Sequence, residues 1–344
     1  MNEKILNQTA LGMVAKGRGI LAADESTSTI GKRFDGIKVE NTEENRRAYR
    51  GMLFMSSGLE QYTSGVIFYE ETLFQKSADG TPFPKLLAQK GIIPGIKVDK
   101  GAKALPGAPG ETITEGLDGL RERLAKYKEA GARFAKWRAV ITIGQGIPTD
   151  YCIETNAHAL ARYAALCQEQ DIVPIVEPEV LMDADNTLEV CQDVTHRTLQ
   201  CVFDELFRQR ILLEGMILKP NMVISGKKCT TQADRKAVAA ATLRTLKQHV
   251  PAAVPGIAFL SGGQSDEDAT AHLDEMNRLV TAGLGGGPWV LSFSYGRALQ
   301  HAALQAWVGR KENVAAGQRA YLHRARMNGL AATGKWEQKL EKAA

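Results

Sequence analysis

A lysine at the end of a largely apolar run is the first residue in this sequence that could do chemistry. The run 211–218 stops at Lys219, and Pro220 follows at once. The residue before a proline is driven toward extended backbone, so we expect Lys219 to end a strand. One lysine at a strand end is usually only solvated, and its significance depends on similar residues elsewhere.

Other ionisable side chains end apolar runs in the same way. They are Asp24, Lys97 with Asp99, Lys136 with Arg138, and Glu177 with Glu179. Residues two apart on a strand point to the same face, and bare charges facing a layer of apolar helices would be costly. We therefore expect these side chains to converge on one polar site. The alternative is that they only neutralise one another as ion pairs.

The charges in this set favour an anionic ligand. The cations Lys97, Lys136, Arg138, Lys219 and Arg297 are set against Asp24, Glu177 and Glu179. Two glycine-containing segments, Ser-Gly-Gly-Gln at 261–264 and Ser-Tyr-Gly-Arg at 294–297, follow apolar runs. Glycine allows backbone N–H groups to approach a phosphate closely. One such segment alone would indicate no more than a turn.

A lysine in these surroundings can act as a nucleophile. Its ordinary pKa near 10.4 leaves on the order of one molecule in a few thousand neutral at pH 7, and a pKa of about 7 requires roughly 4–5 kcal/mol. Burial and a neighbouring cation, here Lys136, can supply that shift for Lys219. The neutral amine could form an imine with a ketone, while a carboxylic acid expels water and a carboxylate accepts a hydroxyl proton during carbon–carbon cleavage.

Eight apolar segments alternate with helical segments along the whole chain. The strands should end near 24, 70, 97, 138, 177, 219, 261 and 294. Helices are expected at about 4–16, from a cap at Thr114 to Gly131, and at 152–169, 188–208 and 232–248, with a helical tail at about 313–344. This count predicts an α/β fold, a (β/α)8 TIM barrel forming a single domain over 1–344, with its chemistry at the carboxyl ends of the strands. A doubly wound open sheet is the alternative.

Composition excludes several classes of protein. A net charge of +4 over 344 residues argues against a dedicated nucleic-acid binder. No uncharged run is long enough to span a bilayer. The five cysteines contain no Cys-x-x-Cys pair, which indicates reduced thiols in a cytoplasmic protein. We therefore expect neither a nucleic-acid nor a membrane partner.

The sequence also argues against a metal or a dinucleotide cofactor. The six histidines fall in or beside expected helices, without the spacing of metal ligands. The glycine run 283–287 mimics a dinucleotide-binding fingerprint, but a strand follows it where the fingerprint requires a helix. We expect a loop there.

Eight motifs spread along the chain resemble those of class I fructose-bisphosphate aldolases. They are LAADES at 21–26, NTEENRR at 41–47, GIKVDKG at 95–101, FAKWR at 134–138, IVEPE at 175–179, LKPNM at 218–222, FLSGG at 259–263 and FSYGRAL at 293–299. The resemblance extends to about residue 313. It implies a (β/α)8 barrel, commonly a homotetramer, that works without metal or cofactor. The implied activity is that of an aldehyde-lyase of glycolysis and gluconeogenesis. It reversibly splits fructose 1,6-bisphosphate, through a lysine Schiff base, into dihydroxyacetone phosphate and glyceraldehyde 3-phosphate.

The resemblance also implies a role for individual residues. Lys219 would be the Schiff-base lysine, Glu177 the acid that assists dehydration and Asp24 the base for cleavage. Lys136 and Glu179 would tune the site. The phosphate next to the ketone would contact Ser261, Gly262, Gly296 and Arg297, with Ser294 nearby. The other phosphate or the carbinol groups would contact Ser26, Thr29, Arg33, Lys97 and Arg138.

The chain departs from the family pattern in two places. Ser28-Thr29 replaces a Gly-Ser step, which keeps a hydroxyl at position 29, so phosphate binding should survive. Long-tailed relatives end in a tyrosine that assists proton exchange at the enamine carbon, whereas this sequence ends Glu-Lys-Ala-Ala. We expect slower exchange, or a substitute such as Tyr321 or Trp336.

Two other functions remain open from the sequence. Another Schiff-base barrel, such as a transaldolase-like enzyme, would share the lysine and its carboxylates. A scaffold role in protein binding would not need Asp24, Glu177 and Lys219 together. The sequence does not rank fructose 1,6-bisphosphate against fructose 1-phosphate as the substrate.

Overall fold

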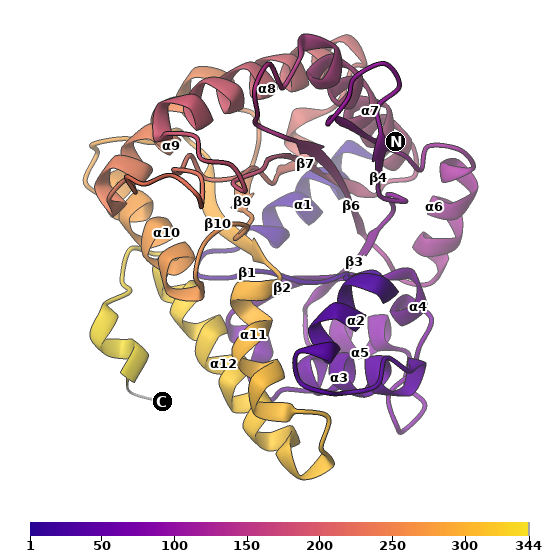
Figure 1. Ribbon diagram of the computed structural model, residues 1–344. Coiled ribbons are helices and arrows are strands. Elements are labelled where there is room, and N and C mark those ends of the chain that lie inside the picture. Colours follow the sequence, from indigo (N-terminus) through magenta and orange to yellow (C-terminus); the bar gives the residue numbers. More distant parts are fainter. Residues whose placement is uncertain (343–344) are drawn as a thin grey trace.

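Eight parallel strands close into a barrel in the computed structural model, which describes residues 1–342 (Figure 1). The order around the barrel is β1-β10-β9-β8-β7-β6-β3-β2. The strands are β1 Gly19–Ala23, β2 Thr63–Phe68, β3 Ile93–Lys97, β6 Phe134–Ile141, β7 Val173–Val180, β8 Ile217–Leu218, β9 Gly256–Phe259 and β10 Val290–Tyr295. Since β1 pairs with both β2 and β10, the sheet has no free edge. The predicted barrel is confirmed, and the open sheet is excluded.

Helices form a layer around the strands (Figure 1). They are α1 Glu3–Met13, α2 Thr27–Asp35, α3 Glu43–Phe54, α4 Glu70–Leu73, α5 Phe83–Gln89, α6 Leu120–Glu129, α7 Asp150–Glu169, α8 Leu188–Arg208, α9 Arg235–His249, α10 Asp266–Thr281, α11 Arg297–Trp307 and α12 Val314–Ala331, with short 3-10 turns at Leu59–Gln61 (η1), Leu213–Gly215 (η2), Lys311–Asn313 (η3) and Gln338–Lys342 (η4). Thr42 and Ser265 cap α3 and α10, and each accepts a hydrogen bond from the backbone N–H three residues on, which satisfies a free donor of the first turn.

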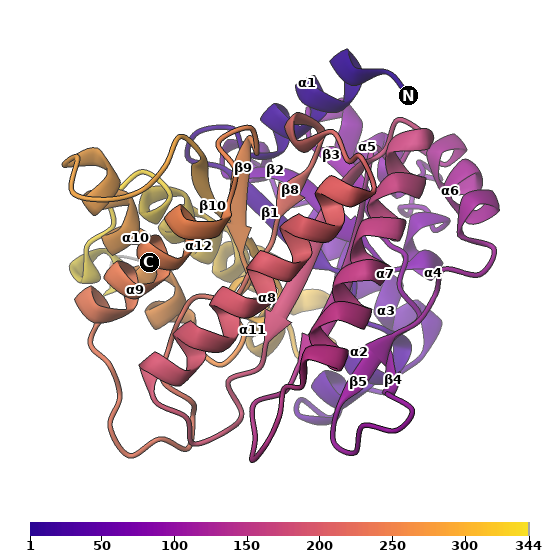
Figure 2. The ribbon, with the colours of Figure 1, turned by 90° about the horizontal axis from the view of Figure 1, so that it is seen from above.

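The end of the barrel where the strands begin is sealed by α1 (Figure 2). Leu6, Ala10 and Met13 of this helix are buried in one cluster with side chains from inside the barrel, namely Ile20, Ile67, Phe134, Val173, Ile175, Ile217 and Ala258. Burial of apolar area at about 25 cal/mol per Å² makes this plug strongly stabilising. Only the opposite end of the barrel is left for polar chemistry.

Successive side chains of strand β6 face alternately toward the helix layer and toward the inside of the barrel. Trp137 is fully buried and stacks on Tyr163 of α7, with ring centroids 5.5 Å apart. Its neighbours Lys136 and Arg138 therefore point inward. Trp137 itself faces the helix layer.

The predicted helix start at Thr114 is wrong. Thr114 ends a hairpin formed by β4 Ala102–Ala104 and β5 Thr112–Thr114, and its hydroxyl donates to the backbone oxygen of Arg138 at 2.7 Å. Helix α6 begins six residues later, after Gly119, whose φ of 62° marks the turn into it. The helical spacing of Leu117 misled the prediction because that residue packs on the core from the loop.

Three further features bear on the sequence-based expectations. All six histidines lie in helices, and 284–289 is a loop before β10. All five cysteines are free thiols in the described chain. Among residues 1–342, no helix combines the length and the apolar character needed to cross a membrane.

The packing at the sealed end can be tested at Gly95. A Cβ there would lie 2.2 Å from the ring of Phe134, its neighbour across the β3–β6 pair. Overpacking of a core typically costs about 1–3 kcal/mol, so Gly95→Ala should lower the midpoint of urea unfolding. Adding Phe134→Leu, which shrinks the opposing side chain, should recover part of the loss. Unchanged stability of Gly95→Ala would contradict this packing.

Candidate active site

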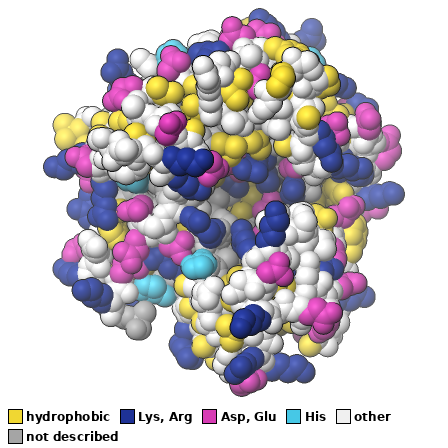
Figure 3. All heavy atoms as spheres, viewed as in Figure 1, with side chains coloured by type: hydrophobic (Ala, Val, Ile, Leu, Met, Phe, Trp, Pro, Cys, Tyr) yellow, Lys and Arg dark blue, Asp and Glu magenta, His cyan; other side chains and the backbone are white. Residues whose placement is uncertain are grey.

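A polar cavity of about 270 Å³ opens at the end of the barrel where the strands finish. Every site residue predicted from the sequence lines it: Asp24, Ser26, Thr29, Arg33, Lys97, Lys136, Arg138, Glu177, Glu179, Lys219, Ser261, Gly262, Ser294, Gly296 and Arg297. Figure 3 shows a hollow at the centre of this face with Lys and Arg side chains around it. The convergence of the strand ends is therefore as predicted, while the role of each residue is a separate question.

The ammonium group of Lys136 stands at the centre of the cavity floor. Its Nζ lies 2.8 Å from Asp24 Oδ2, 3.4 Å from Glu177 Oε2 and 3.8 Å from Asp99 Oδ2. The Lys136 side chain is 5% exposed, so these pairs are shielded from solvent. Ion pairs of this kind need several partners to offset the cost of desolvation.

Lys219 lies immediately beyond β8 and is buried beside Glu177. Its Nζ is 3.1 Å from Glu177 Oε1, and its backbone N–H donates to Val176 O at 2.8 Å. The strand pairing to β7 thus continues through this residue. A single carboxylate, that of Glu177, lies between the two buried ammonium groups of Lys219 and Lys136.

These contacts shift the pKa values of the buried groups. Burial alone would raise the pKa of Asp24, but the ammonium groups of Lys136, Lys219 and Lys97 outweigh it and lower that pKa far below its usual range. Burial likewise opposes ionisation of Glu177, and nearby cations, Lys219 first, lower its pKa. Burial would lower the pKa of Lys136, but Asp24, Glu177 and Asp99 raise it. At neutral pH both carboxylates and Lys136 are charged.

A second pair, Arg138 with Glu179, forms one wall of the cavity. The Arg138 Nε donates to Glu179 Oε2, and the pKa of Arg138 is raised because this carboxylate outweighs burial. Glu179 also packs against the segment after β9, where a Cβ at Gly262 would lie 2.9 Å from its Oε1. A side chain at position 262 would therefore disturb both features.

The cavity has donors suited to a phosphate on the side of β9 and β10. Gly296 caps α11, and the free N–H groups of a helix start attract anions. The Ser294 hydroxyl is 1% exposed and has no hydrogen-bond partner among residues 1–342. Arg297 lies at the start of the same helix and donates to the backbone oxygen of Gln264.

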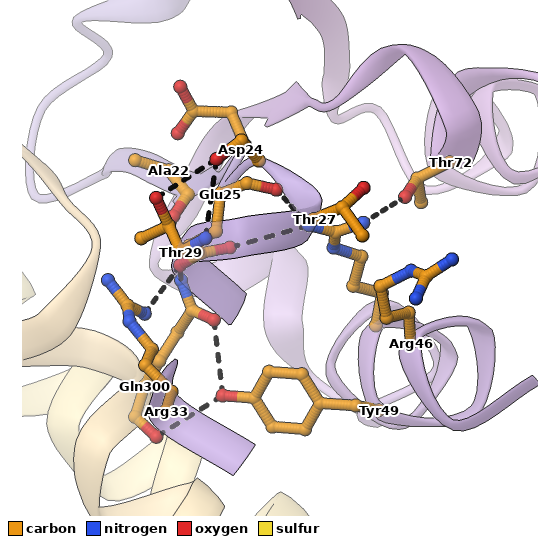
Figure 4. A network of polar contacts seen from close by, with 12 residues as sticks. Ala22, Asp24, Glu25, Thr27, Thr29, Arg33, Arg46, Tyr49, Thr72 and Gln300 are labelled. Carbon is orange, nitrogen blue, oxygen red and sulfur yellow. Dashed lines mark hydrogen bonds and ion pairs between the residues drawn. The ribbon is translucent and has the colours of Figure 1, made fainter. Parts of the chain in front are cut away.

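A second set of donors lies at the start of α2. Ser26 caps this helix, accepting from the backbone N–H of Thr29, and its hydroxyl lies 3.0 Å from that of Thr29. The hydroxyl expected at position 29 is thus present beside Ser26. Arg33, on the same helix, donates to Glu25 Oε1 at 2.5 Å (Figure 4).

Two acidic residues near the cavity, Asp99 and Glu25, had been given no role in the site. Asp99 lies within 3.5 Å of Lys97 and 3.8 Å of Lys136. Its position two residues after Lys97 had placed it among the charged strand ends expected to converge. Glu25 is buried and holds Arg33, and alternation along the strand gave no sign of it because it lies in the turn after β1.

Neither suggested substitute for a tail tyrosine reaches the cavity. Tyr321 is fully buried, and its hydroxyl lies 3.4 Å from that of Thr63 at the start of β2, the opposite end of the barrel. Trp336 is 4% exposed, and its indole N–H donates to Glu341 Oε1 at 2.8 Å. The expectation that Tyr321 or Trp336 acts at the site is wrong, since the tail that carries Trp336 packs against α10 and α12.

Known proteins are similar to this chain over almost its whole length. The family model for fructose-bisphosphate aldolase class-I matches residues 5–344. A probable fructose-bisphosphate aldolase class 1 of Xanthomonas campestris pv. campestris is 59% identical over 338 residues, which is 98% of this chain and 100% of that protein. Fructose-bisphosphate aldolase 1 of Toxoplasma gondii is 55% identical, with 97% of this chain and 91% of that protein covered.

A solved structure is similar in fold as well. The fructose-bisphosphate aldolase of Plasmodium falciparum, in complex with TRAP and a small-molecule inhibitor, superposes with a TM-score of 0.94 and is 52% identical. The match covers 97% of this chain and 96% of that one.

The electrostatics of the cavity floor predict a pKa change on removal of Lys136. In Lys136→Met, burial of Asp24 is opposed by fewer cations, so the pKa of Asp24 rises. As the pH falls, this carboxyl takes up its proton at a higher pH than in the wild type. Carbon-detected NMR of protein labelled with ¹³C-aspartate measures the titration, and Asp24→Asn assigns the signal.

Lys103→Met, at an exposed site on β4, is the matched control and should leave the Asp24 titration unchanged. An Asp24 signal that titrates identically with and without Lys136 would contradict the assigned cause of the pKa shift.

Proposed function

The chain belongs to the class I fructose-bisphosphate aldolase family, and we propose that it splits fructose 1,6-bisphosphate reversibly through an imine on Lys219. The observation that carries the proposal is the buried Lys219 amine 3.1 Å from Glu177, with Asp24 held on the other side of Lys136. Phosphate donors flank this group on two sides, at 261–262 with 294–297 and at the start of α2. The products are dihydroxyacetone phosphate and glyceraldehyde 3-phosphate.

Imine formation uses Glu177 twice. Its Oε1 lies 3.1 Å from the Lys219 Nζ, close enough to take the proton that this nitrogen must lose before it attacks. The neutral amine attacks the C2 ketone, and proton transfer from nitrogen to oxygen gives a carbinolamine. Protonated Glu177 then donates to the departing hydroxyl, water leaves, and a protonated imine remains.

Cleavage then needs a base and an electron sink. The Asp24 carboxylate, ionised because its pKa is lowered, accepts the proton of the C4 hydroxyl. The C3–C4 bond breaks, its electron pair passes into the protonated imine to give an enamine, and the aldehyde leaves. Protonation of the enamine carbon and hydrolysis of the resulting imine return dihydroxyacetone phosphate and the Lys219 amine.

The charged walls of the cavity position the two phosphates. Ser261, Gly262, Gly296 and Arg297, with Ser294 beside them, would hold the phosphate next to the ketone. Ser26, Thr29, Arg33, Lys97 and Arg138 would hold the other phosphate or the hydroxyls. Glu179 supports this arrangement by orienting Arg138. Binding of the two phosphates, one at each end of the substrate, keeps the ketone aligned with Lys219.

The cellular setting is part of the same proposal. The name of the matching family model, which calls the family glycolytic, supports a role in glycolysis and gluconeogenesis. The five free thiols support a reducing compartment, the cytoplasm. We propose a single functional domain and a homotetramer, the assembly common in the family, which light scattering on the purified protein would test.

Chemical trapping tests the lysine directly. Borohydride added with dihydroxyacetone phosphate should reduce the imine to a stable secondary amine, which inactivates the enzyme and adds mass to the peptide that contains Lys219. Lys219→Arg keeps the positive charge but should neither trap nor cleave, with activity reduced by at least about a thousandfold. Activity of the wild type should survive a chelator.

Peptide mass mapping supplies the control within the same sample, because Lys97 and Lys136 line the same cavity. A label on either of them, or no label at all, would overturn the assignment of Lys219.

A further inference from the structure

A buried glutamine outside the cavity, Gln300, connects the two phosphate-binding sides of the site. It lies one turn into α11 and is 1% exposed. Its Nε2 donates to Ala22 O at 2.6 Å and to Glu25 Oε1 at 2.8 Å (Figure 4). These two acceptors stand on either side of Asp24 in the chain.

The orientation of this amide is fixed by Tyr49 of α3. The Tyr49 hydroxyl donates to Gln300 Oε1 at 3.1 Å. Burial raises the pKa of Tyr49, which keeps the phenol protonated and able to donate. Because the oxygen of the Gln300 amide faces Tyr49, the nitrogen must face Ala22 and Glu25. All hydrogen-bonding groups of the side chain are thereby used.

The Gln300 side chain lies where the hydrogen-bonded pairing of β1 with β10 ends. Strands β1 and β10 pair through Ile20 with Ser294 and Leu21 with Tyr295. The carbonyl of Ala22, one residue beyond the last β1–β10 pair, accepts a hydrogen bond from the Gln300 amide. The side chain therefore closes the seam between β1 and β10 at the mouth of the barrel, directly before Asp24.

The Gln300 amide also affects the position of Arg33, through the Glu25 carboxylate that both side chains contact. The Oε1 atom of Glu25 accepts from both Gln300 and Arg33. Its Oε2 atom is buried, has no hydrogen-bond partner in the part of the chain described, and lies 3.8 Å from Arg50. Without the Gln300 amide, one strong partner of this carboxylate is lost, and the position of Arg33 depends on a less constrained Glu25.

We propose that Gln300 is a positioning residue that couples the start of α11, with Gly296 and Arg297, to Asp24 and Arg33. It touches no substrate atom. It holds the end of β1 and the Glu25–Arg33 pair at a fixed distance from the phosphate donors of α11. The proposal rests on the proposed function, because it assigns substrate contacts to Arg33 and Arg297.

The test is Gln300→Met, which keeps the length of the side chain and removes its hydrogen bonds. We expect KM for fructose 1,6-bisphosphate to rise about tenfold, the scale of losing hydrogen bonds to buried acceptors. In an Arg33→Ala background the same substitution should raise KM much less, because the group that Gln300 positions is already gone. A merely structural defect would raise KM by the same factor in both backgrounds.

Gln168→Met is the matched control. Gln168 is 2% exposed, its Nε2 donates to Leu212 O and Gly215 O, and its Oε1 accepts from Leu212 N. These contacts lie near η2, at the sealed end of the barrel. Its loss should lower thermal stability to a similar extent and leave KM unchanged.

Two outcomes would overturn the proposal: an equal rise in KM for Gln168→Met, or a rise for Gln300→Met that persists undiminished without Arg33. Trapping by borohydride distinguishes failure of the Gln300 proposal from failure of the proposed function. Gln300→Met should still be labelled at Lys219 by dihydroxyacetone phosphate at saturating concentration. If the wild type itself is not labelled, the proposed function fails, whatever the KM values show.

Discussion

The site depends on one buried ammonium group, that of Lys136, which holds three carboxylates around it. Asp24, Glu177 and Asp99 come from three different strand ends and would repel one another without a cation between them. An unpaired charge at this depth would cost several kcal/mol. The ammonium therefore makes the cluster stable, and together with the ammonium of Lys219 it keeps both Asp24 and Glu177 ionised.

The barrel supplies the geometry that this cluster needs. Parallel strands bring residues from distant parts of the chain to one end, and alternation along β6 sends Lys136 and Arg138 inward while Trp137 anchors the strand to α7. The plug formed by α1 closes the other end. Glu177 then lies between the ammonium groups of Lys136 and Lys219, while Asp24 contacts that of Lys136.

Much of this arrangement could be predicted because it follows from local patterns in the sequence. Apolar runs that end in charges identified Lys219, Glu177 and Asp24, and the count of strands identified the barrel. The hairpin of β4 and β5 could not be predicted, since each strand has only three residues and β4 is exposed along its whole length. Gln300 gave no signal either, because it is one polar residue in a helix and its partner Glu25 lies 275 residues away. Such contacts depend on the closed barrel rather than on any local pattern.

Glu177 and Asp24 are proposed to act at separate steps, imine formation and carbon–carbon cleavage. The most direct test is rapid mixing of Asp24→Asn with fructose 1,6-bisphosphate, followed by borohydride quenching and mass analysis of the peptide containing Lys219. We expect the six-carbon substrate to be trapped on Lys219 in near-stoichiometric amount while release of glyceraldehyde 3-phosphate almost stops. Cleavage at the wild-type rate, or failure to trap any six-carbon adduct, would contradict these separate roles.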